Sequence, residues 1–350
     1  MDNSSQRKIL RVSPACEIPQ LAGQITSALV GDGPTLGFGE ITSESAPHYA
    51  AVVVGTSGSS GASKEVALTA TALISSARAS HKFIGAKPGQ TWSLLLPLTH
   101  IAAVNVIVRS IELGTLPIDL RNYEGEYPKV DYTSIVPTQL FRALNGDVRL
   151  LNHLKSAKTV LVGGAALSQS LRNQAELAGI KVITTYGMTE TCGGCVYDGE
   201  VLDGVEVEIR NGKINIRGPI LASSISLDAG WYETSDLGEI VDEKLLVLGR
   251  ADDVIISGGE NLSLHAVEES LSKAFPDIQS AAFAIEDPQW GHSLQIAIVG
   301  EVSDELISSH LEKELGAFAK PKGIHHLASL PLLGIGKVDR KALAKGISHE

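Results

Sequence analysis

Cysteine is scarce in this sequence, and long apolar segments are absent. Three cysteines among 350 residues, Cys16, Cys192 and Cys195, are too few and too scattered for a disulfide framework, which is typical of a reducing compartment. No apolar run approaches the roughly 20 residues that span a bilayer, and Met1 to Gln20 contains no apolar signal core. We therefore expect a soluble, cytoplasmic protein without membrane insertion.

Positive charge is also in short supply. The 29 Lys and Arg residues against 40 Asp and Glu residues leave a net charge of -11. Nucleic-acid and anionic-membrane partners require clustered basic residues, so this balance argues against both. A composition of 43% hydrophobic and 20% charged residues is ordinary for a globular protein, and the length allows two domains with their own cores.

An apolar strand, Val52–Val54, leads into a loop rich in glycine and hydroxyl groups, Gly55-Thr56-Ser57-Gly58-Ser59-Ser60-Gly61-Ala62-Ser63-Lys64. Glycines let backbone N–H groups approach an anion, and the hydroxyls and the lysine add hydrogen bonds and charge. Two residues separate Gly61 from Lys64, so the Walker A spacing is not met. Taken alone, the segment is equally compatible with a plain surface turn.

Four further motifs follow this loop in the sequence. They are Tyr186-Gly187-Met188-Thr189-Glu190, Trp231-Tyr232-x-Thr234-x-Asp236, Leu248-Gly249-Arg250-Ala251-Asp252-Asp253 and Gly336-Lys337-Val338-Asp339-Arg340. Five short motifs in this order resemble the adenylate-forming enzymes, which comprise acyl-CoA synthetases, luciferases and peptide-synthetase adenylation domains. The later four resemble that family's nucleotide motif, ribose motif, hinge and catalytic-lysine segment.

The sequence departs from the family pattern near the first motif. Ser63 and Glu65 stand where a proline and a glycine usually flank the loop lysine, and the Glu65 carboxylate is expected to neutralise Lys64 in part. Typical members also carry a much longer segment before the loop. This shortening, together with the segments Ile255–Asn261 and Asp287–Gly291, resembles the short o-succinylbenzoate-CoA ligases of actinobacteria, which serve menaquinone synthesis.

The hydrophobic pattern predicts an α/β fold. Short apolar strands alternate with helical stretches, which favours βαβ units, a parallel sheet and ligand binding at the strand ends. The Asn211-Gly212 pair predicts a hairpin in a β-rich subdomain after Gly194. The predicted strands are Ala50–Val54, Trp92–Leu96, Ser134–Val136, Thr159–Val162, Lys181–Thr184, Val205–Arg210 and Lys213–Arg217; the predicted C-terminal helices are Ser263–Phe275 and Glu305–Leu315.

The resemblance implies the adenylate-forming fold in two domains. A large N-terminal domain, 1–249, would bind ATP and the acid, with its first subdomain truncated. A hinge at 250–252 would join it to a small mobile α+β domain, 253–350, that carries the catalytic lysine. The Cys192-Gly193-Gly194-Cys195 spacing alone could suggest a metal site, but no second Cys or His pair follows at ligand spacing.

The same resemblance implies a two-step reaction and a set of residue roles. ATP and a small carboxylic acid would form an acyl-adenylate, and CoA would then displace AMP. Lys337 and Mg²⁺ would stabilise charge on the α-phosphate, with Glu190 holding the metal and Thr189 contacting that phosphate. The phosphate-loop residues would be Thr56, Ser57, Gly58, Ser59, Ser60, Gly61 and Lys64, and the nucleoside residues Gly163, Gly164, Ala165, Tyr186, Gly187, Asp236 and Arg250.

Three further roles concern the acid, the hinge and the thiol. His100 and Gly187 would line the acyl pocket, Asp252 would act as the hinge, and Gly258 and Gly259 would border the CoA channel. Each role has a structural alternative. Asp236 could be a turn residue, Arg250 and Asp252 could form a surface ion pair, and His100 could be a buried structural histidine.

The function that these observations favour is CoA ligation of o-succinylbenzoate with cleavage of ATP to AMP and pyrophosphate. One alternative is a CoA ligase for another aromatic or short-chain acid, and another is a stand-alone enzyme that loads a carrier protein. A third alternative, from a different class, is a non-catalytic ATP-binding relative, although the presence of both Lys337 and Glu190 speaks against it.

Overall fold

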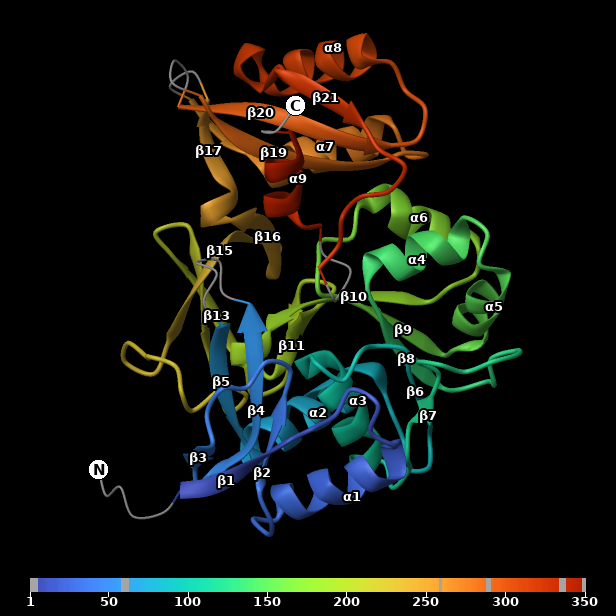
Figure 1. Ribbon diagram of the computed structural model, residues 1–350, viewed down its shortest axis with the longest axis vertical. Helices are drawn as coiled ribbons and strands as arrows, with labels where there is room; N and C mark the ends of the chain where they lie inside the picture. Colours follow the sequence, from blue (N-terminus) through green and yellow to red (C-terminus); the bar gives the residue numbers. More distant parts are fainter. Residues whose placement is uncertain (1–5, 58–62, 258–259, 288–290, 334–337, 348–350) are drawn as a thin grey trace.

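The computed structural model describes residues 6–57, 63–257, 260–287, 291–333 and 338–347. Figure 1 shows the chain in two stacked parts, with the C-terminal strands and helices at the top of the view and the rest of the chain below. No helix in the described residues is both long and apolar enough to cross a membrane.

The first sheet is built by the N-terminal strands in the order β3-β1-β2-β4-β5. Strand β4 runs parallel to β2 but antiparallel to β5. The prediction that Ala50–Val54 belongs to the main parallel sheet is therefore wrong. The short connection from β4 to β5 allows only a hairpin, whereas parallel neighbours need a long crossover. The elements are β1 (Gln6–Arg11), α1 (Ile18–Leu29), β2 (Thr35–Phe38), β3 (Ser45–Pro47), β4 (Ala50–Ser57) and β5 (Ser63–Thr69).

The second sheet has the order β12-β11-β10-β9-β8-β6-β7. Its five strands from β10 to β7 are parallel, as predicted, and β11 and β12 continue it in antiparallel fashion. The strands are β6 (Trp92–Leu94), β7 (Ile118–Asp119), β8 (Tyr132–Ile135), β9 (Thr159–Val162), β10 (Val182–Met188), β11 (Gly193–Tyr197) and β12 (Glu200–Val201). The associated helices are α2 (Ala70–Ile84), α3 (Ile101–Glu112), α4 (Pro137–Leu144), α5 (Val148–Ser156), α6 (Gln169–Leu177) and the one-turn η1 (Thr189–Thr191).

Strand β10 is longer than the sequence predicts. It pairs with β9 only as far as Thr184 and then with β11 through Met188, with a register shift between Tyr186 and Gly187. The Tyr186-Gly187 motif therefore lies where the strand leaves the parallel sheet, rather than in a loop after it.

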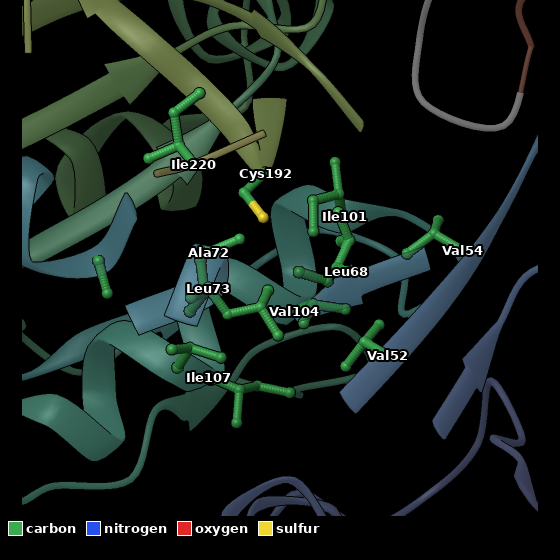
Figure 2. Close-up of a cluster of buried hydrophobic side chains, with 14 of the residues drawn as sticks. Val52, Val54, Leu68, Ala72, Leu73, Ile101, Val104, Ile107, Cys192 and Ile220 are labelled. Carbon is green, nitrogen blue, oxygen red and sulfur yellow. The ribbon is translucent and has the colours of Figure 1, made fainter. Parts of the chain in front are cut away.

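Alternating side chains of the second sheet enter two different cores. Leu161 faces the larger core, whereas its neighbours Val160 and Val162 face a smaller core under α4, α5 and α6. Figure 2 shows the larger core, in which Val52 and Leu68 of the first sheet meet α2 and α3. These two helices thus lie between the sheets and fix one sheet relative to the other.

A third sheet, β13-β14-β15-β16, forms the predicted β-rich subdomain. The hairpin prediction is confirmed: β13 and β14 pair around Asn211 and Gly212, which both have positive φ, as a type I′ turn requires. The strands are β13 (Glu206–Arg210), β14 (Lys213–Arg217), β15 (Tyr232–Val241) and β16 (Lys244–Arg250).

The C-terminal residues build a sheet and a core of their own. Val267 and Leu271 of one helix and Leu311 of another pack on Ile296 of the sheet. The C-terminal core shares no residue with the larger core, which supports the predicted boundary between two domains at 249–253. This boundary stays a prediction. The elements are η2 (Ala251–Asp253), β17 (Val254–Ser257), β18 (Glu260–Ser263), α7 (Leu264–Ala274), β19 (Gln279–Asp287), β20 (Gly291–Val299), α8 (Asp304–Leu315), η3 (Ala317–Ala319), β21 (Gly323–His326) and α9 (Arg340–Ile347).

Candidate active site

Lys64 and Glu190, which lie 126 positions apart in the sequence, meet in the structure. Lys64 Nζ on β5 is 3.3 Å from Glu190 Oε1 on η1. The lysine side chain is 52% exposed, whereas that of Glu190 is only 15% exposed. The residue predicted to bind phosphate and the residue predicted to bind magnesium thus form an ion pair that is open on one side.

Glu65 turns away from Lys64. Its carboxylate accepts hydrogen bonds from the backbone N–H groups of Thr42 at 2.6 Å and of Ser43 at 3.0 Å. Partial burial alone would raise the pKa of Glu65, but these hydrogen bonds from Ser43 and Thr42 outweigh it and lower the pKa to about 2. The expectation that Glu65 neutralises Lys64 is wrong, because successive residues of a strand face opposite sides of the sheet.

Tyr186, Asp236 and Arg250 form a second group, and Tyr186 lies on the strand that leads into η1. The Tyr186 hydroxyl donates to Asp236 Oδ2 at 2.8 Å, and Arg250 Nη1 lies 3.9 Å from Asp236 Oδ1. Burial, followed by the nearby Asp236 carboxylate, raises the pKa of Tyr186, so its hydroxyl is a neutral donor. Asp236 lies within β15, opposite Arg250 of β16, and the alternative that it is a turn residue is therefore wrong.

Arg250 also pairs with the predicted hinge residue. Its Nη2 lies 2.7 Å from Asp252 Oδ2, and both side chains are about half exposed. The surface ion pair considered from the sequence is present, and it coexists with the approach of Arg250 to Asp236. A guanidinium has five N–H donors, so the two contacts do not compete.

Close packing against side-chain and backbone atoms explains two glycines of this region. A Cβ atom at Gly163 would lie 2.2 Å from Thr185 Oγ1, and one at Gly187 would lie 2.0 Å from the carbonyl oxygen of Gly193. Gly164 has φ +83°, which favours glycine for a different reason. Together these positions bring the segment after β9, with Ala165, alongside β10.

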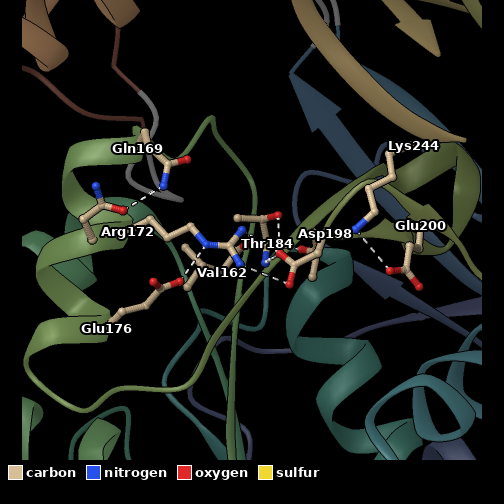
Figure 3. Close-up of polar contacts among 10 residues, drawn as sticks. Val162, Gln169, Arg172, Glu176, Thr184, Asp198, Glu200 and Lys244 are labelled. Carbon is tan, nitrogen blue, oxygen red and sulfur yellow. Dashed lines mark hydrogen bonds and ion pairs between the residues drawn. The ribbon is translucent and has the colours of Figure 1, made fainter. Parts of the chain in front are cut away.

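A polar network ties the first half of β10 to the turn that follows β11. Asp198 accepts hydrogen bonds from Thr184 N at 2.9 Å and from Thr184 Oγ1 at 2.8 Å. Figure 3 shows Arg172 reaching from α6 to the same carboxylate, at 2.9 Å. The network therefore fixes the strand that carries Tyr186 two residues further on.

The one-turn helix η1 presents Thr189 and Glu190. It is held from below by buried Thr191, whose hydroxyl oxygen accepts from Met188 N at 2.9 Å and lies 2.8 Å from the Gly193 carbonyl oxygen. Next to it, burial raises the pKa of the Cys192 and Cys195 thiols, to about 12 for Cys195. Within the described ranges, no three His, Cys, Asp or Glu side chains are grouped as a metal site.

Helix α3 carries one predicted residue and one that the sequence analysis missed. His100 is its N-cap, without a side-chain capping bond. Arg109, in its last turn, is only 4% exposed, and its Nη2 donates to the Tyr197 hydroxyl at 2.9 Å. Its Nε has no hydrogen-bond partner, and no ion pair to a carboxylate is found for it within the described residues. The sequence does contain a signal for this residue, because a charged arginine inside the largely apolar segment Ile101–Ile111 indicates a buried cation.

Two predicted phosphate-loop residues lie in β4, and seven other predicted residues lie outside the described ranges. Thr56 is in β4, and its hydroxyl donates to the Lys64 carbonyl at 3.1 Å. Ser57 ends the same strand. The remaining phosphate-loop residues, the two CoA-channel glycines and the catalytic lysine lie outside the described residues; they are Gly58, Ser59, Ser60, Gly61, Gly258, Gly259 and Lys337.

Comparison with known proteins identifies the family. Residues 13–219 match the family described as AMP-binding enzyme. The chain belongs to the AMP-binding enzyme family. A probable 2-succinylbenzoate–CoA ligase of Mycobacterium tuberculosis is 38% identical over 331 residues, which cover 86% of this chain and 85% of that protein. A 2-succinylbenzoate–CoA ligase of Lactococcus lactis is 28% identical over 323 residues, covering 84% and 70%.

Solved structures of AMP-binding enzymes have the same fold. MenE of E. coli with a bound analogue of OSB-AMS superposes with a TM-score of 0.69 at 26% identity, covering 98% of this chain and 83% of that one. O-succinylbenzoate coenzyme A synthetase of Bacillus subtilis, in complex with AMP, gives a TM-score of 0.71 at 26% identity, covering 84% and 69%. The predicted adenylate-forming fold and family are confirmed.

Proposed function

We propose that this member of the AMP-binding enzyme family is an ATP-dependent o-succinylbenzoate-CoA ligase of menaquinone synthesis. The observation that carries the proposal is the 38% identity, over 86% of this chain and 85% of the relative, to a probable ligase for this acid. Two sets of contacts between predicted site residues support it: Lys64 with Glu190, and Asp236 with Tyr186 and Arg250.

The proposed reaction has two steps. A carboxylate oxygen of the acid attacks the α-phosphorus of ATP, so a P–O bond to the acyl oxygen forms and pyrophosphate leaves. The thiolate of CoA then attacks the acyl carbon, a C–S bond forms, and AMP leaves with the former carboxylate oxygen. Both steps need stabilisation of phosphate charge more than a protein nucleophile. Because ATP and CoA are the co-substrates, we place the reaction in the cytoplasm.

The residues present fit a nucleotide and a metal ion. A triphosphate would take the ammonium of Lys64, while the carboxylate of Glu190 is an oxygen ligand of the kind that Mg²⁺ prefers. Magnesium would supply charge neutralisation on the phosphates. When the nucleotide and the metal ion bind, Lys64 would exchange its contact with Glu190 for one with phosphate. Glu190 would likewise exchange Lys64 for Mg²⁺, so each side chain would keep a partner of opposite charge. Thr189, beside Glu190, would contact the α-phosphate, and Lys337 would stabilise its developing charge.

The nucleoside would lie beside the second group. Asp236 is an acceptor-only carboxylate in a largely buried position, so it suits the two ribose hydroxyls. Arg250 would support the same sugar. The hydrogen bond from Tyr186 to Asp236 holds the tyrosine ring in place, and this ring would stack on adenine.

Arg109 offers a reason for the choice of acid. O-succinylbenzoate carries two carboxylates, and only one reacts, so the other needs a cation within the protein. Asn105, one turn before Arg109, donates to the carbonyl of Cys192, just before β11, at 2.6 Å, and Arg109 itself donates to Tyr197 at the end of β11, so this face of α3 lies against β11. Strand β11 in turn pairs with the β10 residues Tyr186 and Gly187. We therefore assign the second carboxylate to Arg109.

Arg109→Lys tests this assignment. The variant keeps the charge but loses the planar fork, so the KM for o-succinylbenzoate should rise roughly tenfold, which corresponds to about 1.4 kcal/mol. The KM for benzoylpropionate, which lacks the ring carboxylate, should stay unchanged. An equal rise for both acids would exclude the assignment.

The function itself is tested by pyrophosphate release from ATP over a panel of carboxylic acids, with and without CoA, and with products identified by mass. We expect release with o-succinylbenzoate and a CoA thioester product. Preference for another acid would keep the chemistry and change the pathway, and transfer only to a carrier protein would change the acceptor. No release with any acid would favour a non-catalytic ATP-binding protein.

A further inference from the structure

Arg340, the first residue of α9, joins three separate elements of the C-terminal part through its guanidinium group. Nη1 lies 3.2 Å from Asp253 Oδ2 in η2, and Nη2 lies 2.8 Å from Glu268 Oε1 in α7. Nε donates to the carbonyl of Ala282 in β19 at 2.8 Å. A planar fork of donors can hold three such acceptors in one geometry, which an ammonium group cannot do.

The partners of Arg340 are themselves held. Glu268 Oε1 also accepts a hydrogen bond from Ala282 N at 2.9 Å, so the carboxylate is tied to the same strand as the arginine. One turn along α9, Leu343 is buried against Ala281 and Phe283 of β19. Helix α9 is therefore attached to β19 by an apolar contact as well as by a polar one.

The position of Arg340 in the chain links two predicted functional parts. Val338 forms a bridge with Leu332, and Asp339 N donates to the Pro331 carbonyl at 2.8 Å, so the chain on either side of residues 334–337 is brought together. Lys337 comes directly before Val338 in the sequence. At the other end of the network, Asp253 directly follows the predicted hinge residue Asp252.

We propose that Arg340 is a positioning residue for the adenylation step. By joining η2, α7 and β19, it makes the chain after the hinge and the base of the Lys337 segment move as one body. A rotation at Asp252 then carries the lysine to a defined place. This inference rests on the proposed function and adds a residue to it. Misplacement by about 1 Å can cost on the order of 100-fold in rate.

The test separates the two half-reactions in Arg340→Met. Adenylation is measured as acid-dependent exchange of pyrophosphate into ATP, and thioester formation as conversion of a supplied acyl-adenylate by CoA. We expect adenylation to fall on the order of 100-fold while thioester formation changes only a few fold. Lys337→Ala gives the loss expected when the lysine is removed. Arg340→Lys should recover part of the adenylation rate, because the charge remains.

Lys345→Met is the matched control. Lys345 lies exposed on the same helix, so the variant removes one positive charge without touching Asp253 or Glu268. Both of its half-reactions should equal those of the wild type. Equal losses in both half-reactions of Arg340→Met would overturn the proposal and leave Arg340 a structural residue only.

Asp253→Asn keeps the test decisive if Arg340→Met does not fold, because it leaves the contact between Arg340 and Glu268 in place. Adenylation should again fall more than thioester formation. Hydrogen exchange gives a readout without activity: amides from Val338 to Leu343 should exchange faster in this variant, while those of β19 and β20 keep their protection. Unchanged exchange at 338–343 would overturn the proposal, even if o-succinylbenzoate and every other acid proved not to be substrates of the wild type.

Discussion

Two ionic contacts in this protein, Lys64 with Glu190 and Arg340 with Asp253 and Glu268, differ in the number of partners and in the solvent exposure of the basic side chain. Lys64 and Glu190 share one contact of 3.3 Å, and the lysine side chain is 52% exposed. Arg340 reaches two carboxylates at 3.2 and 2.8 Å and is 31% exposed. An exposed pair contributes at most about 1 kcal/mol because water and salt compete with it, whereas removing Arg340 from its partly buried network leaves two carboxylates without their partner. The exposed contact between Lys64 and Glu190 is thus suited to an exchange of partners, and the Arg340 network is suited to holding η2, α7 and α9 together.

Glu65 extends the comparison to two carboxylates near one lysine. Glu190 makes a single contact with Lys64, whereas Glu65 accepts three hydrogen bonds from Thr42 and Ser43. The first carboxylate is available to a metal ion, whereas Oε1 of the second already accepts three hydrogen bonds. A variant at Glu190 should therefore lower activity with little change in stability, whereas a variant at Glu65 should lower stability with little change in activity.

Glu190→Gln should have the largest effect on activity. The amide keeps the shape but loses the charge that the proposed magnesium site needs, so adenylation should fall on the order of 100-fold. Thermal stability should change little, because only an open ion pair is lost. The measurement is pyrophosphate exchange over a range of Mg²⁺ concentrations, with a melting curve beside it. An unchanged rate at every magnesium concentration would exclude Glu190 as the metal ligand.

Asp252→Pro should have an intermediate effect on one half-reaction. A fixed φ prevents the rotation that a hinge requires, so conversion of a supplied acyl-adenylate by CoA should slow roughly tenfold while adenylation is spared. Asp252→Ala is the control, because it also removes the contact with Arg250 but leaves the backbone free. Equal rates in the proline and alanine variants would argue against a hinge.

Glu65→Gln should leave both half-reactions nearly unchanged and act on stability alone. The folded-state pKa of Glu65 is lowered to about 2, so its contribution to stability is present above the ordinary pKa and is lost as pH falls toward 2. We expect the variant to be less stable at pH 7 by about 1 kcal/mol, after allowance for solvent screening. Chemical denaturation at pH 7 and near pH 2 measures this, and the difference should vanish at the lower pH.

Local signals in the sequence were good predictors where the physics is local. Asn211-Gly212 predicted its turn because both residues tolerate positive φ. The equivalent turn between β15 and β16 uses Asp242 and Glu243, which also have positive φ. The Asp-Glu dipeptide is not a sequence signal for such a turn. There the pairing of the two long strands imposes positive φ on Glu243, a residue type that seldom adopts it.

Sheet membership was harder to predict than the strands themselves. Ala50–Val54 was found as a strand, but its partner Thr35–Phe38 was not, so its sheet could not be inferred. Arg109 was missed because its burial against Trp92 and Tyr197 depends on how α3 packs in the folded chain. Periodicity indicates that a residue lies on a helix but does not say what faces it across the core.

The sequence by itself determined the order of the motifs, and with it the family, the kinds of side chain available and the tight turns that those residues favour. Only the tertiary structure decided which of these side chains act together. Glu65 is adjacent to Lys64 in the chain, yet Glu190, 126 positions away, is its partner. The reason is that strand geometry turns neighbouring residues to opposite faces, while packing of the sheets around α2 and α3 brings distant residues to the same place.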